Sequence, residues 1–158
     1  MSLAHQMAVL FRRDLTRLLQ QVRAFPDEAT LWKTAPAIAN SAGNLMLHLE
    51  GNLCEYIGRR LGGVPYHRQR DLEFATKTLP AGDLARRLEA ILELVPRVVS
   101  TLSREDLEAP YPEDALGAPS TPQQVLISMH GHLNYHLGQI DYLRRVLTQG
   151  AAIDYAGL

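Results

Sequence analysis

The sequence predicts an all-α protein, a single four-helix bundle that extends over residues 1–158. Four long segments place apolar residues at helical spacing, loops rich in proline and glycine separate them, and no segment alternates like a strand. The 158 residues are 46% hydrophobic and 21% charged, which is typical of one globular domain. Two long connections, at about 62–80 and 103–120, allow a topology other than a simple up-down bundle.

The first two helices are bounded by proline, glycine and capping residues. Residues 3–24 form the first helix, and Pro26 ends it because the residue before a proline disfavours helical geometry. The second helix begins at Asn40 or Ser41, both good N-cap residues, and runs to about Leu61, where two glycines follow.

The third helix starts between Ala81 and Asp83 and runs to about Leu102. Pro96 lies inside its apolar pattern and should kink or split it, because proline lacks the N–H that an internal helical position donates. The preceding polar segment, residues 64–78, is predicted to be an ordered loop over one end of the bundle.

The last helix has the clearest boundaries. Thr121 is its expected N-cap, Pro122 occupies the favoured first position, and Gln124 completes a capping box. The apolar stripe continues to Thr148, and Gly150 is expected to end the helix.

Composition and charge exclude several classes of protein. The net charge is −1, so the surplus of Lys and Arg that nucleic-acid binding requires is missing. A single cysteine, Cys54, excludes an internal disulfide and a multi-cysteine metal site. No apolar run approaches the ~20 residues of a membrane span. A secretory signal requires a basic region before its apolar stretch, and none precedes the apolar patch at 7–11. We therefore expect a cytoplasmic protein without nucleic-acid or membrane partners.

Three histidines form the pattern that indicates chemistry. His132 and His136 are four residues apart, so on a helix they lie ~40° apart around the axis and ~6 Å apart along it. Both lie at the edge of the apolar stripe, where imidazoles are costly to bury unless hydrogen bonds or a metal ion satisfy them. His48 lies in an apolar stretch of the second helix and offers a third ligand if the two helices pack together. Three protein ligands leave a position open, as in catalytic metal sites.

Each part of this pattern also has a simpler interpretation. An inward-facing histidine such as His48 is commonly a hydrogen-bonded core residue, and a histidine pair at this spacing also occurs by chance. Gly51, inside the second helix, is expected to leave room for a bound group beside His48. We expect His5 at the surface or in first-helix packing, and His67 in a solvated loop or at the mouth of a site. His130 is expected on a second face, as a surface or interface residue.

The sequence resembles the DinB/YfiT-like superfamily of four-helix-bundle metalloenzymes. The resemblance lies in NLMLHLEGNL at 44–53, LGG at 61–63, RQRDLEF at 68–74 and HLNYHLGQI at 132–140. It implies a divalent metal ion, zinc or nickel with iron or manganese as further options, held by His48, His132 and His136. It also implies homodimers, and its characterised members include transferases and isomerases that use low-molecular-weight bacterial thiols such as bacillithiol or mycothiol.

Three functions are compatible with these features. The first is a thiol S-transferase for a small-molecule substrate, in which the ion activates a thiol for attack on an electrophile. The second is a hydrolase that uses bound hydroxide, with Glu55, or Glu50 in poorer alignment, as general base. The third is a non-enzymatic metal-binding bundle of stress response or sensing. Cys54 lies ~120° from His48 around the helix axis, so we expect it in the core and not as a fourth ligand.

Several charged and aromatic side chains have two interpretations each. Arg68, Arg70 and Asp71 either border a pocket for an anionic substrate or form a salt-bridged loop that closes the bundle. Trp32 and Tyr135 line either a pocket or a dimer face.

Overall fold

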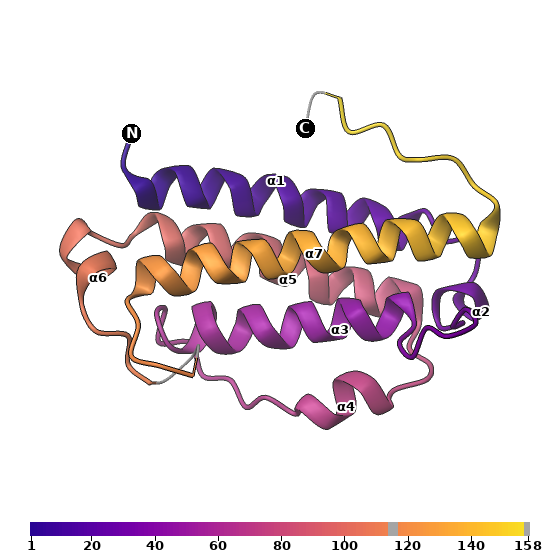
Figure 1. Cartoon of the computed structure of the whole chain (residues 1–158), viewed down its shortest axis with the longest axis horizontal. Helices are drawn as coiled ribbons and strands as arrows, with labels where there is room; N and C mark the ends of the chain where they lie inside the picture. The colour runs from indigo at the N-terminus through magenta and orange to yellow at the C-terminus, as the bar shows by residue number, and fades with distance from the viewer. Residues whose placement is uncertain (114–116, 157–158) are drawn as a thin grey trace.

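The structure, a computed structural model, is an all-helical bundle and describes residues 1–113 and 117–156 (Figure 1). Its long helices are α1 (Leu3–Arg23), α3 (Ala42–Leu53), α5 (Ala81–Ser100) and α7 (Pro122–Thr148). Helix α3 continues into a π-helix, η1 (Cys54–Arg59), and the short helices are α2 (Glu28–Leu31), α4 (Arg70–Ala75) and α6 (Arg104–Glu108). The predicted fold class is confirmed. Residues 114–116 of the predicted loop and residues 157–158 of the predicted domain lie outside the described residues.

The direction of the helices follows from the long connection after η1. Figure 1 shows α1 and α7 running in one direction and α3 and α5 running in the opposite one. Residues 60–80 therefore cross the length of the bundle along the outside of α3 before α5 begins. The connection through α6 stays at the end where α5 finishes and α7 starts. The topology is thus not a simple up-down bundle.

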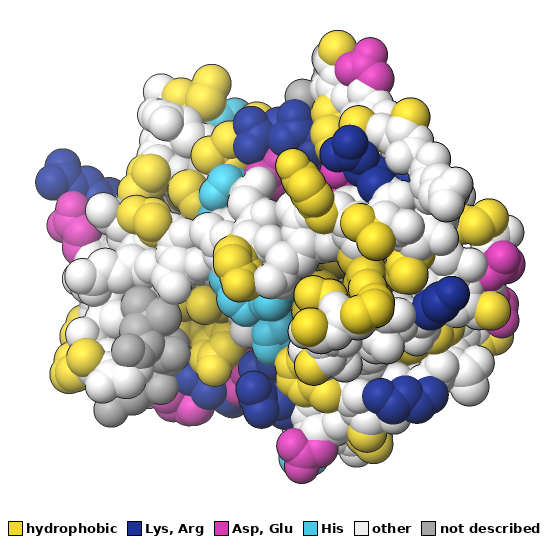
Figure 2. Space-filling view, turned by 45° about the vertical axis from the view of Figure 1, so that its right-hand side comes forward, with side chains coloured by type: hydrophobic (Ala, Val, Ile, Leu, Met, Phe, Trp, Pro, Cys, Tyr) yellow, Lys and Arg dark blue, Asp and Glu magenta, His cyan; other side chains and the backbone are white. Residues whose placement is uncertain are grey.

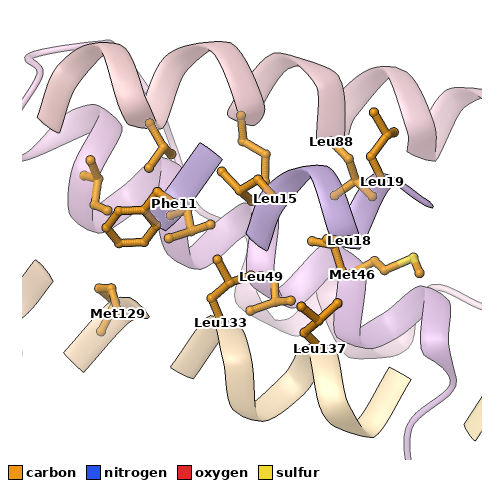
Figure 3. Close-up of a cluster of buried hydrophobic side chains, with 14 of the residues drawn as sticks. Phe11, Leu15, Leu18, Leu19, Met46, Leu49, Leu88, Met129, Leu133 and Leu137 are labelled. Atoms are coloured by element: carbon orange, nitrogen blue, oxygen red, sulfur yellow. The ribbon is translucent and has the colours of Figure 1, made fainter. Parts of the chain in front are cut away.

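The core lies between the four long helices, because α1 and α3 each pack against both α5 and α7. Buried side chains from all four helices meet there, as Figure 3 shows for Phe11, Leu15, Leu18, Leu19, Met46, Leu49, Leu88, Met129, Leu133 and Leu137. Within α1, α5 and α7 the buried residues recur mostly at intervals of three or four, whereas α3 is buried on all sides. None of the described helices combines the length and the apolar character that a bilayer crossing requires.

Capping hydrogen bonds confirm two of the predicted helix starts. The Ser41 hydroxyl accepts a hydrogen bond from the Asn44 backbone N–H at the start of α3, and the Asn44 Oδ1 accepts one from the Ser41 backbone N–H. Thr121 and Gln124 form the same reciprocal pair at the start of α7. Each capping box satisfies backbone donors that the first helical turn leaves unpaired.

Two predicted details of the helices differ in the structure. Pro96 does not split α5, which runs unbroken from Ala81 to Ser100 with the proline ring buried. The missing N–H removes one hydrogen bond, and packing of the apolar face keeps the helix continuous around it. Helix α7 ends at Thr148 as predicted, but the left-handed residue that follows it is Gln149, with a φ of 54°, and not Gly150.

The polar segment 64–78 contradicts the prediction of a loop over one end of the bundle. It contains α4, which packs along α3 on the outside of the bundle (Figure 1). The Asn44 amide fixes this placement, because its Nδ2 donates to the carbonyl oxygens of Glu73 and Thr76 at 2.9 and 2.8 Å. Asn44 is buried on the first turn of α3, so α4 is held at a defined position beside that helix.

A buried carboxylate joins α1 to α7 beside the core. The Asp14 side chain is fully buried and accepts hydrogen bonds from Arg13, Arg17, His130 and Asn134 at 2.8–3.0 Å. Burial alone would raise the pKa of Asp14, but the hydrogen bonds from His130 and Arg13 outweigh it and hold the pKa well below its usual range. His130 therefore lies between two helices, and its predicted place on a surface or interface face is wrong, because this carboxylate draws it inward.

We expect Asp14→Ala to lower the free energy of unfolding by about 3 kcal/mol, because it leaves the donors of α1 and α7 without their buried acceptor. Urea denaturation measures this loss. The matched control is Arg12→Ala on the same helix, whose ion pair with Glu93 is exposed and should contribute less than about 1 kcal/mol. Equal losses in the two variants would contradict the role assigned to Asp14.

Candidate metal centre

Three imidazole rings from two helices meet at one point. The Nε2 atom of His132 lies 3.2 Å from Nε2 of His48 and 3.0 Å from Nε2 of His136. Nitrogens that share one zinc ion at ~2.0–2.1 Å are about 3.3 Å apart in tetrahedral geometry, so these spacings match a common ion. The structure thus brings together the histidines chosen from the sequence, and they could hold a metal ion. In the space-filling view of Figure 2, histidine side chains are visible in a recess of the surface, so a ligand can reach them.

The other ring nitrogens show which protons the histidines carry. His48 Nδ1 lies 2.9 Å from the Glu73 carboxylate, and His136 Nδ1 lies 2.7 Å from Gln139 Oε1. Both partners are acceptors, so a neutral ring at either position carries its proton on Nδ1 and presents a lone pair at Nε2. His132 Nε2 can donate only one proton, so at least one of its two contacts joins lone pair to lone pair. A shared cation removes that repulsion, and the donor set therefore fits a metal ion.

Glu73 is the residue of the candidate site that the sequence analysis missed. It reaches His48 from α4, and its carboxylate also accepts hydrogen bonds from Arg68 at 2.7 and 2.9 Å. Burial alone would raise the pKa of Glu73, but the hydrogen bonds from Arg68 and His48 outweigh it and lower the pKa, so the carboxylate stays ionised. A carboxylate on the outer nitrogen orients the ring and raises the basicity of Nε2, as at many metal-binding histidines.

Gly51 explains how this carboxylate fits beside α3. A Cβ at position 51 would overlap with Glu73 Oε1 and would lie 3.5 Å from Arg68 Nε. The space beside His48 is therefore taken by a side chain of the protein, and the expectation of a bound group in it is wrong. A glycine inside a helix costs about 1 kcal/mol relative to alanine, and that cost was the one sequence signal that pointed to a missing partner.

The two carboxylates considered as general bases are paired with arginines. Glu55 lies in η1 and accepts hydrogen bonds from Arg59 and Arg60, and the bonds from Arg59 lower its pKa despite partial burial. Glu50 faces α5 and pairs with Arg87 at 2.8 Å. Burial raises the pKa of Glu50 despite its ion pair, but both carboxylates are engaged by arginines, so neither offers a free base to the histidines.

The remaining polar candidates divide between the site and the bundle surface. Arg68 joins the site through its ion pair with the α4 carboxylate. Arg70 instead lies over the Phe74 ring, 5.3 Å from its centroid, and Asp71 is exposed. Cys54 packs against the core as predicted, and burial raises the pKa of its thiol to about 12.

The aromatic candidates and the other histidines do not belong to the group of three described histidines that could hold a metal ion. Trp32 packs at the start of α3, where its Nε1 donates to a backbone carbonyl before α5 at 3.0 Å. Tyr135 is 64% exposed, and its ring centroid lies 5.2 Å from that of His136. His5 and His67 are exposed, as predicted for a surface residue and a solvated loop residue.

The chain is a helical bundle with one histidine on α3 and a His-x-x-x-His pair on the facing helix α7. This arrangement defines a class of candidate metal-binding bundles. The chain belongs to the DinB superfamily, which it matches over residues 10–140. It is also similar to the crystal structure of a conserved protein from Enterococcus faecalis, with a TM-score of 0.73 and 19% identity. That match covers 95% of this chain and 99% of the other, and it shows a shared fold. No curated protein matches the chain.

We expect Gly51→Ala to weaken metal binding about 10–100-fold, because the added methyl group displaces Glu73 from His48. The matched control is Gly131→Ala on α7, where an added Cβ meets none of the described atoms within 4 Å. This control should keep the metal affinity and stabilise the fold by about 1 kcal/mol. Competition with a chromophoric chelator measures the affinity, and thermal denaturation measures the stability. A Gly51→Ala protein with the affinity of the parent would refute the role of Glu73.

The stability of the metal-free protein should fall as the pH falls from 6.5 to about 4. Burial and the neighbouring imidazoles lower the pKa of His132 from 6.5 to about 4. In that window the unfolded chain binds a proton at His132 and the folded chain does not, so acid favours unfolding.

Urea denaturation with a chelator present, repeated across this window, measures the pH dependence. His132→Asn should make it shallower, whereas His5→Asn, at an exposed histidine of α1, should leave it as in the parent. Identical pH dependences in the parent and in His132→Asn would show that the His132 environment does not resist protonation.

Proposed function

We propose that the protein is a metal-dependent enzyme that holds a divalent ion through Nε2 of His48, His132 and His136. The observation that carries the proposal is the approach of His132 Nε2 to Nε2 of His48 and of His136 at 3.2 and 3.0 Å, with two of the rings directed at acceptors through Nδ1. Imidazole ligands suit zinc or nickel, and iron or manganese are further candidates. The cluster of described residues supplies three ligands, so an ion there keeps a coordination position for a small molecule.

A bound ion supplies one kind of chemistry, since it lowers the pKa of a thiol or water that coordinates to it. The residues of the chain set the geometry for that chemistry. Glu73 accepts the Nδ1–H of His48, and Arg68 keeps Glu73 ionised and in place. Gln139 supports His136 in the same way, so two of the three rings are fixed before a ligand arrives.

Among the possible reactions we favour transfer of a thiol to a small electrophilic substrate. A thiol has an ordinary pKa of about 8.5 and water one of about 15.7, so a thiol needs far less acidification to attack at neutral pH. Hydrolysis by bound hydroxide is the alternative, but Glu55 and Glu50, the bases that it would use, are paired with arginines. A low-molecular-weight thiol of the bacillithiol type is therefore the proposed co-substrate.

Elemental analysis of the purified protein tests the metal. We expect about one divalent ion per chain in the parent, and a loss of affinity of about tenfold or more in His132→Ala. His5→Ala, which replaces an exposed histidine of α1, should retain the ion. An ion content that His132→Ala does not change would overturn the proposal.

The same preparations test the reaction. The loaded parent, given a bacillithiol-type thiol and a chloroaromatic or an epoxide, should form a thioether faster than the metal-free protein and faster than His132→Ala. If the parent holds the ion and forms no conjugate above the metal-free control, the transferase is refuted, and hydrolysis or a non-enzymatic metal-binding role takes its place. The cytoplasmic location and the homodimer stay predictions.

A further inference from the structure

A cavity of about 600 Å³ lies between the loop that precedes α3 and the C-terminal half of α7. It is lined by loop residues 35–40, by Leu45 of α3, and by Gln139, Tyr142, Leu143 and Val146 of α7. None of these residues carries a charge, and their polar side-chain groups are two amides and the Tyr142 hydroxyl. The volume is that of pockets for small molecules, and the lining suits an uncharged apolar ligand.

The cavity lies next to the candidate metal centre and shares Gln139 with it. Gln139 lines the cavity and also accepts the hydrogen bond from His136 Nδ1 at 2.7 Å. Leu45 lines it from α3, three residues before His48, which is less than one helical turn of ~5.4 Å. On both α3 and α7, a residue that lines the cavity therefore lies within one helical turn of a histidine of the candidate metal centre.

The loop wall of the cavity is held in an unusual backbone conformation. Ala37 has a φ of 63°, in the left-handed region that residues with a Cβ rarely adopt. A hydrogen bond from the Ile38 N–H to the Ala35 carbonyl, 3.0 Å long, closes the turn around it. This turn leaves the Ile38 side chain 49% exposed at the cavity and out of the core. Strained backbone of this kind is concentrated at binding sites.

We propose that this cavity binds the uncharged, apolar part of the substrate, an alkyl or aryl electrophile, and places its reacting carbon beside the three imidazoles. The electrophile rests on the proposed function, whereas binding of an apolar group needs only the cavity. An anionic group is disfavoured, because the lining offers no cation and burial of an unpaired charge is costly.

The cavity acts on the reaction by positioning. The thiol sulfur forms a bond to the substrate carbon, and in a chloroaromatic the carbon–chlorine bond breaks. Chloride leaves with the bonding electrons, and the thiol proton passes to solvent. Holding the apolar group fixes the carbon at the centre and makes the attack effectively intramolecular.

Fluorescence titration of the metal-free full chain with phenylnaphthylamine, an uncharged apolar dye, tests the cavity. Val146→Glu adds a carboxylate to the lining at a residue that is 66% exposed, so the fold should be retained. Ile127→Glu is the matched control, since Ile127 lies on the same helix, is 53% exposed and does not line the cavity. We expect dye affinity to fall about tenfold or more in Val146→Glu and to change less than about twofold in Ile127→Glu.

The outcomes separate this proposal from the proposed function. His132→Ala should lose the ion and the reaction but bind the dye like the parent. Equal dye affinities in the parent and in Val146→Glu would overturn the cavity proposal. Sedimentation velocity that shows Val146→Glu converting a parent dimer into monomers would also overturn it, because a second copy would then occupy the cavity.

Charge selectivity gives a second readout with the ion bound. Chlorodinitrobenzene should react faster than its carboxylated analogue in the parent. The Val146→Lys variant should reduce this difference in rate, because the added lysine can pair with the carboxylate. Equal rates for the two electrophiles in the parent would contradict an uncharged pocket.

Discussion

The candidate metal centre depends on the hydrogen bond between His48 Nδ1 and the Glu73 carboxylate. This contact exists because Asn44 holds α4 against the first turn of α3 and because Gly51 leaves space for the carboxylate. A buried carboxylate without a partner would take up a proton, and Arg68 prevents this. An amide, a glycine and an arginine thus decide the direction in which one imidazole presents its lone pair.

The three histidines could be predicted from the sequence because their signal is local. Four-residue spacing places His132 and His136 on one helical face, and apolar neighbours place His48 on an inward face. Glu73 could not be predicted in the same way. It lies 25 residues after His48 in a polar segment without periodicity, and its position depends on a tertiary contact with Asn44.

The predictions that failed concern side-chain directions that depend on an irregular helical segment or on a contact between two helices. Glu55 is predicted as the better-aligned general base on the assumption of α-helical spacing, but it lies in η1, where i→i+5 bonding puts more residues into each turn. His130 is predicted on a second face, as a surface or interface residue, and a buried carboxylate on α1 draws it inward. In both cases the helix was predicted correctly, while the direction of one side chain depended on its partners.

The crossover that carries α4 along the outside of α3 has a consequence for protein design. Copying three histidines onto the facing helices of another bundle would reproduce the ligand atoms and leave one ring free to rotate. A graft that keeps the orientation of His48 also needs the segment that carries α4. That segment requires the Glu73 carboxylate, the glycine at position 51 and the Asn44 amide that holds α4 against α3. The smallest transferable unit is therefore α3 with the chain that follows it through residue 76, together with the histidine turn of α7.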